Sequence, residues 1–268
     1  MKKPLMYADS EGERLPTWNP HPGCGFKCTY CYGPAQYAIF SKCDKCKAYK
    51  PHFHEERMKQ TFKKGKTYFV ESLGDPSFIP PDIFQRILDH LAKFQETTFM
   101  LQSKNPIYFK DFTYTNNICL GTTIETNLDK LAQCYSKAPV PSERHRGLMK
   151  TMEAHLELNY YLTFEPIMTC SIWEMQQYAL ISDISAVYIG RDNHGHRLPE
   201  PSEQDLMKLI EKLLQPQFDK EQIHTKTLGP AWWELAQGES HTDDLSSQRL
   251  KSSGGLNIAH AQKGKKRN

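Results

Sequence analysis

Short apolar runs alternate with amphipathic segments along most of this chain. The runs are rich in aromatic and β-branched residues and end at polar or turn-forming residues, which is typical of buried strands. We expect six such strands near residues 17–19, 67–72, 97–101, 118–125, 160–165 and 186–190, with residues 223–227 as a further candidate.

Between these runs the apolar residues recur with the period of a helix. One such apolar stripe lies on the segment from Asp82 to Phe94. Asp82 and Gln85 at the start of this segment match a capping box. Ser171 and Ser202 predict the starts of two later helices. Repeated strand–helix alternation favours right-handed βαβ units and a parallel sheet. Since barrels of this kind reach this length as one unit, we predict an α/β fold, a partial (β/α)6-type TIM barrel with parallel strands.

The composition agrees with a globular protein. The chain has 268 residues, of which 38% are hydrophobic and 24% charged. Neither an apolar run of about 18 residues nor a signal peptide is apparent, so we expect no membrane partner and a cytoplasmic location. The net charge of +3 permits an anionic substrate without predicting one.

The composition changes beyond Gln237. Ser, Gly, Asp, Gln and Lys dominate there, and the chain ends in a basic cluster between Lys263 and Arg267. We therefore expect a barrel domain over residues 1–237 and a disordered basic tail over residues 238–268.

Eight cysteines in a reducing compartment favour ligands or buried thiols over a disulfide scaffold. Three of them, Cys24, Cys28 and Cys31, lie within eight residues. Converging thiolates select zinc, Cu(I) or an iron–sulfur cluster. A structural zinc site has four protein ligands, whereas three ligands leave one position open for chemistry.

The Cys-x3-Cys-x2-Cys spacing, with Tyr30 just before the third cysteine, resembles the loop of the radical S-adenosylmethionine (radical SAM) enzymes. The wider sequence from Thr17 to Cys31 looks like a phage-associated branch related to spore photoproduct lyase. The resemblance implies that Cys24, Cys28 and Cys31 hold a [4Fe-4S] cluster whose fourth iron binds SAM. It also implies an electron donor such as flavodoxin or ferredoxin, and hydrogen abstraction from a substrate.

A second cysteine pair follows, in an insertion near residues 41–56. Cys43 and Cys46 are followed by His52 and His54. This group is a candidate second metal site, for zinc or an added cluster, although the His-x-His half lacks the usual spacing of three to five residues. The alternative is two free thiols on a polar loop.

Polar residues follow most predicted strands, where the loops of a parallel barrel meet and catalytic residues are found. The resemblance to radical SAM enzymes implies roles for some of them. Ser72 and Asp75 are candidates for the ammonium group of SAM, and Tyr30 for its adenine side. The candidates for its ribose or carboxylate are Thr123, Glu125 and Glu165.

Two other classes of function remain open from the sequence. The loop cysteines and the Cys43–Cys46 pair together could share zinc in a structural or nucleic-acid-binding protein, or a barrel could keep the cluster without catalysis. The substrate is open as well. The basic tail, the Trp232–Trp233 pair and the resemblance to a DNA-lesion lyase favour a nucleic acid or nucleotide, although paired tryptophans more often pack in a core.

Overall fold

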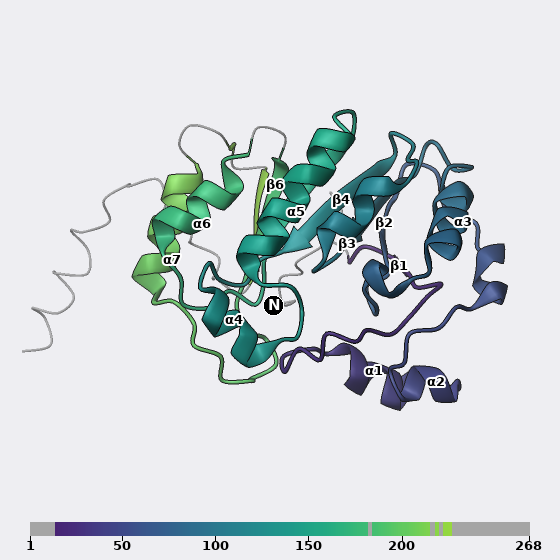
Figure 1. Cartoon of the computed structure of the whole chain (residues 1–268), viewed down its shortest axis with the longest axis horizontal. Helices are drawn as coiled ribbons and strands as arrows, with labels where there is room; N and C mark the ends of the chain where they lie inside the picture. Colours follow the sequence, from purple (N-terminus) through teal and green to yellow (C-terminus); the bar gives the residue numbers. More distant parts are fainter. Residues whose placement is uncertain (1–13, 182–183, 215–217, 220–221, 227–268) are drawn as a thin grey trace, which may run out of the picture.

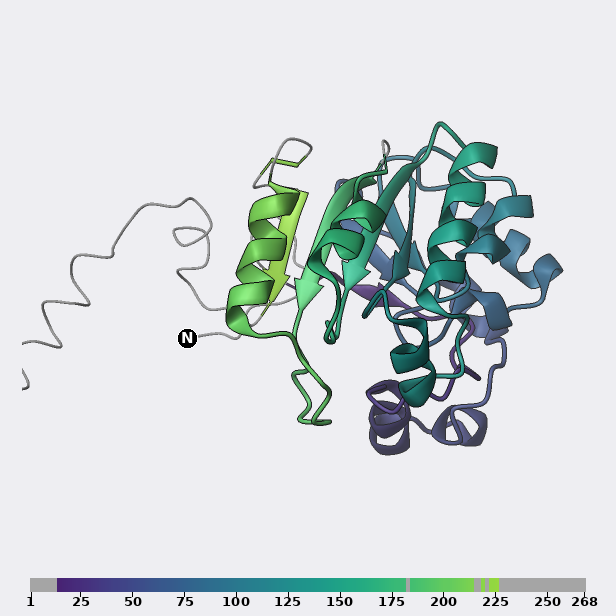
Figure 2. The same cartoon turned by 60° about the vertical axis from the view of Figure 1, so that its left-hand side comes forward.

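The computed structural model describes residues 14–181, 184–214, 218–219 and 222–226. Within them seven parallel strands form one sheet in sequence order. The strands are β1 (Thr17–Trp18), β2 (Thr67–Val70), β3 (Thr98–Gln102), β4 (Ile118–Thr123), β5 (Asn159–Phe164), β6 (Ile184–Gly190) and β7 (Ile223–Lys226). The sheet curls into part of a barrel (Figure 1, Figure 2). The predicted α/β partial TIM barrel is confirmed, and the seventh candidate strand is present.

Helices cover the outer face of this sheet. The helices are α1 (Gly33–Phe40), α2 (Asp44–Lys47), α3 (Pro81–Leu91), α4 (Asp129–Tyr135), α5 (Pro141–Ala154), α6 (Ile172–Ala179) and α7 (Glu203–Leu213), with 3-10 turns η1 (Glu55–Lys59), η2 (Pro76–Phe78) and η3 (Pro106–Asp111). Helices α3, α5, α6 and α7 bury apolar stripes against the sheet. The short helices α1 and α2 lie together at the carboxyl ends of the strands, below the barrel in Figure 1.

The side chains of each strand alternate between the two faces of the sheet. In β5, Tyr160 and Leu162 join the main core under the helices, whereas Tyr161 packs in a smaller cluster on the inner face. The Tyr161 ring has room only because Gly121 on β4 has no side chain, since a Cβ there would lie 2.4 Å from the ring. Side chains therefore fill the interior of the barrel at the height of Gly121 and Tyr161.

The inner face becomes polar towards the carboxyl ends of the strands. The Thr163 hydroxyl donates to the Gln102 side-chain oxygen at 2.9 Å, and the Gln102 amide donates to the Thr123 hydroxyl. Three neighbouring strands are thereby tied together just inside the barrel mouth, the edge formed by the carboxyl ends of the strands.

The predicted helix starts are partly right. The Ser171 and Ser202 hydroxyls each accept a hydrogen bond from the backbone N–H three residues on, which confirms them as N-caps. The Asp82 capping box is wrong. The helix begins one residue earlier, at Pro81, because a proline suits the first turn of a helix. The Gln85 side chain instead donates to Asp89 on the next turn of the same helix and to the Thr113 carbonyl of a neighbouring loop.

Some expectations lie outside the described residues: the Trp232–Trp233 pair and the tail over residues 238–268. The division at residue 237 stays a prediction. Across the part of the chain that the structure describes, no helix combines the length and the apolar character needed to cross a bilayer.

Candidate metal and cofactor site

The loop of Cys24, Cys28 and Cys31 follows β1 at the barrel mouth. Its backbone is attached to two other parts of the mouth. The Gly23 N–H donates to the Leu73 carbonyl at 3.0 Å, and the Thr29 N–H donates to the Tyr135 carbonyl at 2.9 Å. The loop is thus held between the end of β2 and the end of α4.

Two glycines beside Cys24 let the loop take this path. Gly23 has φ +101°, and a Cβ there would lie 2.5 Å from the carbonyl carbon of Lys50. A Cβ at Gly25 would lie 2.6 Å from the Phe78 ring. Neither position has room for a larger residue unless its neighbours move.

The three thiols are free and half-buried. Each has a polar neighbour: the Phe26 N–H lies 3.4 Å from Cys24 Sγ, the Ser136 hydroxyl 3.1 Å from Cys28 Sγ, and the Tyr49 hydroxyl 3.8 Å from Cys31 Sγ. Burial raises the pKa of Cys24 and of Cys31, and charge on the neighbouring thiolates acts in the same direction. A bound cation would relieve both effects, because metal coordination deprotonates a thiol outright. The donor set therefore fits a cationic iron–sulfur centre.

The four residues of the candidate second site also come together. Cys43, Cys46, His52 and His54 offer ligand atoms that all lie within 4.8 Å of one another. In the described part of the chain no loop cysteine belongs to such a tight group. The cysteines near the N-terminus thus form two groups rather than one shared site.

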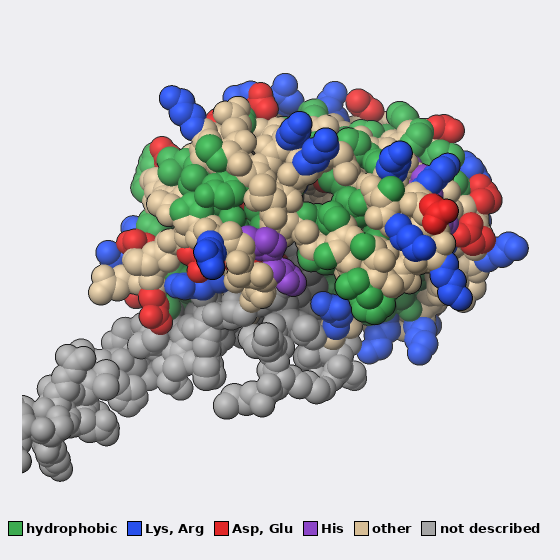
Figure 3. Space-filling model, turned by 90° about the horizontal axis from the view of Figure 1, so that it is seen from below, with side chains coloured by type: hydrophobic (Ala, Val, Ile, Leu, Met, Phe, Trp, Pro, Cys, Tyr) green, Lys and Arg blue, Asp and Glu red, His purple; other side chains and the backbone are tan. Residues whose placement is uncertain are grey.

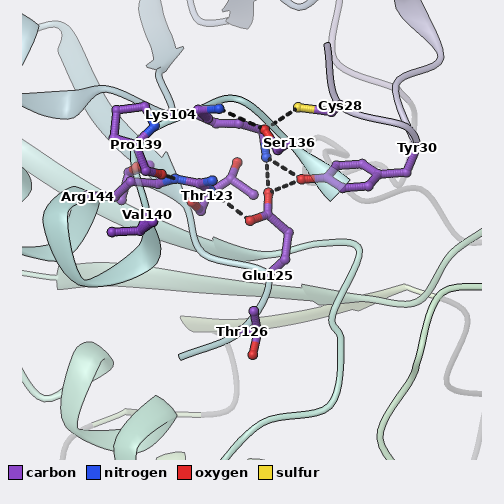
Figure 4. Close-up of polar contacts among 12 residues, drawn as sticks. Cys28, Tyr30, Lys104, Thr123, Glu125, Thr126, Ser136, Pro139, Val140 and Arg144 are labelled. Carbon is purple, nitrogen blue, oxygen red and sulfur yellow. Dashed lines mark hydrogen bonds and ion pairs between the residues drawn. The ribbon is translucent and has the colours of Figure 1, made fainter. Parts of the chain in front are cut away.

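Glu125 connects the cysteine loop to the barrel (Figure 4). Its carboxylate is fully buried just beyond β4. Arg144 Nη1 donates to Oε2 at 2.7 Å, the Tyr30 hydroxyl donates to Oε1 at 2.9 Å, and Lys104 Nζ forms an ion pair with Oε1. The Glu125 side chain therefore joins the cysteine loop, the turn after β3 that contains Lys104, and helix α5.

The electrostatic balance of this network is positive. Two cations, Lys104 and Arg144, face the single Glu125 carboxylate. Burial lowers the pKa of Lys104 to about 8, while charge on Cys28 acts in the opposite direction. Lys104 Nζ lies 3.3 Å from the Tyr30 hydroxyl and 5.2 Å from the centre of its ring. Lys104 therefore places a cation beside Cys28, which suits a thiolate or an anionic ligand there.

Asp75 is buried at the mouth and saturated by internal donors. Its carboxylate accepts from the Ser77 N–H at 3.0 Å, the Ser103 hydroxyl at 2.7 Å and the Lys104 N–H at 2.9 Å. These bonds cap η2 and fix the turn after β3. Contact of Asp75 with the ammonium group of SAM stays a prediction.

The other sequence-predicted residues line the same mouth in different settings. The Ser72 hydroxyl donates to the Asn19 side chain at 3.2 Å. Thr123 is buried and bonded to Gln102, whereas Glu165 is half-buried beside the loop that follows β6. Their contacts with a cofactor stay predictions.

The sequence analysis missed Arg144, Ser136 and Tyr49. Arg144 had a detectable signal, since it lies four residues before Leu148 and eight before Met152, in the buried stripe of α5. A charged residue in such a stripe usually has a buried partner. Ser136 and Tyr49 lie outside any periodic pattern.

No family model matches the sequence, and no curated protein matches it. Solved structures do match. A structure of spore photoproduct lyase aligns with a TM-score of 0.50 and 11% identity, covering 82% of this chain and 67% of the lyase. SuiB from Streptococcus suis aligns with a TM-score of 0.52 and 13% identity, covering 86% of this chain and 53% of SuiB. The chain has the fold of these two proteins.

A second SuiB structure, bound to the precursor peptide SuiA, also aligns with this chain. Its TM-score is 0.51 and its identity 13%, and the alignment covers 82% of this chain and 52% of SuiB. The chain therefore spans about half the length of SuiB. The predicted relation to spore photoproduct lyase is confirmed for the fold, and membership of a phage-associated branch stays a prediction.

Proposed function

We propose that this chain is a radical SAM enzyme. Cys24, Cys28 and Cys31 would hold a [4Fe-4S] cluster, and SAM would bind its remaining iron. The observation that carries the proposal is the number of thiols at the barrel mouth. Three half-buried cysteines lie there, and the neighbouring pair, Cys43 and Cys46, contacts two histidines instead. A three-thiol site keeps one iron available for a ligand.

The surrounding residues would orient the cofactor and exclude water. Glu125 fixes Tyr30 and Lys104 beside Cys28 and is itself held by Arg144. When bound and given an electron by an external donor, the cluster and SAM would supply radical chemistry that removes hydrogen from the substrate. The chain's part is to place the cofactor against the substrate and to exclude competing reactions.

Anaerobic reconstitution with iron and sulfide tests the cluster. We expect a brown protein with about four irons per chain, and loss of most iron and colour in Cys28→Ala. Cys134→Ala is the matched control, because Cys134 is an exposed thiol on α4. A colourless protein that binds only zinc under these conditions would contradict the proposal and favour a zinc-binding structural protein.

Turnover is a separate test. With dithionite, or with reduced flavodoxin or ferredoxin as donor, the reconstituted protein should release 5′-deoxyadenosine from SAM. If it holds the cluster yet gives no more product than Cys28→Ala, the chain is a barrel that keeps the cluster without catalysis.

We propose a nucleic acid or nucleotide as the substrate class. Tyr32, next to Cys31, is 44% exposed, and its ring stacks on that of His194 with centroids 6.0 Å apart. Figure 3 shows the lower face of the molecule, where histidine side chains gather beside a hollow. An exposed aromatic pair of this kind is a surface on which a base can stack.

Binding to a fluorescent single-stranded oligonucleotide checks the substrate class. Tyr32→Ala should weaken binding roughly tenfold, because stacking contributes about 1–3 kcal/mol per base. Trp173→Ala is the control, since Trp173 in the first turn of α6 is a more exposed aromatic residue that does not belong to the cysteine loop. Equal effects of the two changes, or binding of peptides alone, would contradict a nucleic-acid substrate.

A further inference from the structure

The insertion between α1 and η1 contains a compact group of sulfur and nitrogen atoms, which the proposed enzyme chemistry does not use. Cys43 Sγ lies 3.3 Å from His52 Nε2. Cys46 Sγ lies 3.5 Å from His52 Nε2 and 3.2 Å from His54 Nε2. All four ligand atoms lie within 4.8 Å of one another.

These separations match a single tetrahedral ion. With Zn–S bonds of about 2.3 Å and Zn–N bonds of about 2.0–2.1 Å, a tetrahedral zinc ion holds sulfur and nitrogen ligands about 3.5 Å apart. Two thiolates and two imidazoles form one of the ligand sets found in closed structural zinc sites.

The other nitrogen of each imidazole is also engaged. His52 Nδ1 lies 2.7 Å from the Lys50 carbonyl oxygen, and His54 Nδ1 lies 2.7 Å from Glu56 Oε1. Both neighbours are acceptors, which favours a proton on each Nδ1 and a free lone pair on each Nε2. His52 Nε2 faces both sulfurs, and His54 Nε2 faces Cys46 Sγ. Such carbonyl and carboxylate contacts are the usual outer partners of zinc-bound histidines.

The backbone explains why His-x-His spacing suffices here. The His52 N–H donates to the Pro22 carbonyl at 3.2 Å, and the His54 N–H donates to the Pro20 carbonyl at 2.8 Å. The segment is therefore extended, and residues two apart point to the same side. Phe53, between them, packs against the main core. A spacing of three to five residues is needed only where the histidines lie on a helix.

We propose that Cys43, Cys46, His52 and His54 bind one structural zinc ion, separate from the cysteine loop at the barrel mouth. The zinc would fix α2 and the His52–His54 segment as one unit. That unit supports the loop, because Lys50 packs on Gly23 and the Tyr49 hydroxyl lies 3.8 Å from Cys31 Sγ. In Figure 1 and Figure 2 the short helix α1 lies beside α2 of this unit.

Metal analysis of the full chain, purified without a metal-binding tag, tests the proposal. We expect about one zinc ion per chain in the unmodified protein and in the control Cys134→Ser. Cys43→Ser combined with Cys46→Ser should lose at least nine-tenths of it. Replacement by Co²⁺ should give the visible bands of tetrahedral cobalt with thiolate ligands.

Two further variants separate this proposal from the enzyme proposal and guard against misfolding. A Cys24→Ala, Cys28→Ala, Cys31→Ala triple variant should lose iron but keep zinc. Glu56→Gln leaves all four ligands in place and should weaken zinc binding about tenfold or more in a chelator competition. Iron in place of zinc in the triple variant would overturn the zinc assignment. So would a zinc-free unmodified protein, or zinc content that Cys43→Ser and Cys46→Ser leave unchanged.

Discussion

At the scale of single residues, the buried ion pair of Arg144 and Glu125 is the contact with the largest expected effect. Arg144 is 1% exposed, and Arg144→Met would remove its ion pair with Glu125, so that Lys104 is the cation that remains beside this buried carboxylate. Losing a hydrogen bond to a charged group costs about 1.5–3 kcal/mol. Urea denaturation should therefore show a strongly reduced free energy of unfolding.

Arg146→Met is the matched control, because Arg146 lies on the same helix and is exposed. It should change the free energy of unfolding by less than about 0.5 kcal/mol. Adding Glu125→Gln to Arg144→Met should not recover the loss, because Lys104 then loses its carboxylate partner. Equal stability of Arg144→Met and Arg146→Met would show that the pair contributes nothing.

Glu71 gives the chain a pH dependence at the residue scale. Its side chain is fully buried, with Oε1 accepting from the His21 N–H at 2.6 Å, and burial raises its pKa to about 8. In the unfolded chain the pKa is about 4.3. Between these values the folded state holds a proton that the unfolded state has released, so rising pH destabilises the protein.

We therefore expect the free energy of unfolding to fall by up to about 1.4 kcal/mol per pH unit between pH 5 and 8 from this group. Glu71→Gln should flatten that fall, and the difference between the two proteins isolates the contribution of Glu71. The exposed Glu153→Gln serves as control. Parallel curves for the unmodified protein and Glu71→Gln would rule out a raised pKa.

At the scale of elements, the contact between the cysteine loop and the insertion depends on Gly23. Gly23→Ala would place a Cβ 2.5 Å from the Lys50 carbonyl carbon and would strain a backbone with φ +101°. We expect a lower melting temperature and at least a twofold loss of iron after reconstitution, because the loop can no longer hold its path.

Gly65→Ala separates strain from contact. Gly65 also has a positive φ, +71°, but a Cβ there meets nothing within 4 Å. This control should cost only the roughly 1–2 kcal/mol of a left-handed backbone and leave iron loading unchanged. If both alanines lower iron loading equally, the packing of Lys50 on Gly23 has no role in the site.

The elements also show what the sequence can and cannot predict. Strands such as β4 and β5 could be predicted from their composition, because they are apolar runs. Their observed ends differ from the expected ones by one or two residues. The predicted start of α3 was wrong, because Pro81 fits the first turn of the helix better than Asp82 fits the N-cap position. The His-x-His pair was ambiguous, because its function depends on an extended segment paired with Pro20 and Pro22.

At the scale of the whole molecule, strand–helix alternation predicted the barrel, and the rule for strand ends predicted its candidate functional edge. The rule located Glu125 and Lys104 but did not show that they contact each other. Arg144 and Tyr30 reach Glu125 from positions 19 and 95 residues away in the chain, so only the closed fold brings them together. The same holds for Tyr49, which approaches Cys31 only once the insertion has folded back.

The composition of residues 238–268 predicts a tail that does not contribute to the folded core. Within the described residues, the buried side chains of the main cluster lie between Trp18 and Ile223. Deleting residues 238–268 should therefore shift the melting temperature by no more than about 2 °C, which corresponds to about 0.5–1 kcal/mol for a domain of this size. Iron and zinc content should also stay unchanged, because every proposed ligand lies before residue 55.

Nucleic-acid binding is the property that the same deletion should alter. The tail ends in Lys263, Lys265, Lys266 and Arg267, and each cation that neutralises a phosphate adds to the salt dependence of binding. Affinity for a single-stranded oligonucleotide should fall, and the slope of log K against log salt should become shallower by up to about 0.7 per lost contact. An unchanged slope would mean that the tail makes no phosphate contacts and that binding depends on the barrel mouth alone. A large drop in melting temperature would instead mean that residues 238–268 belong to the folded domain.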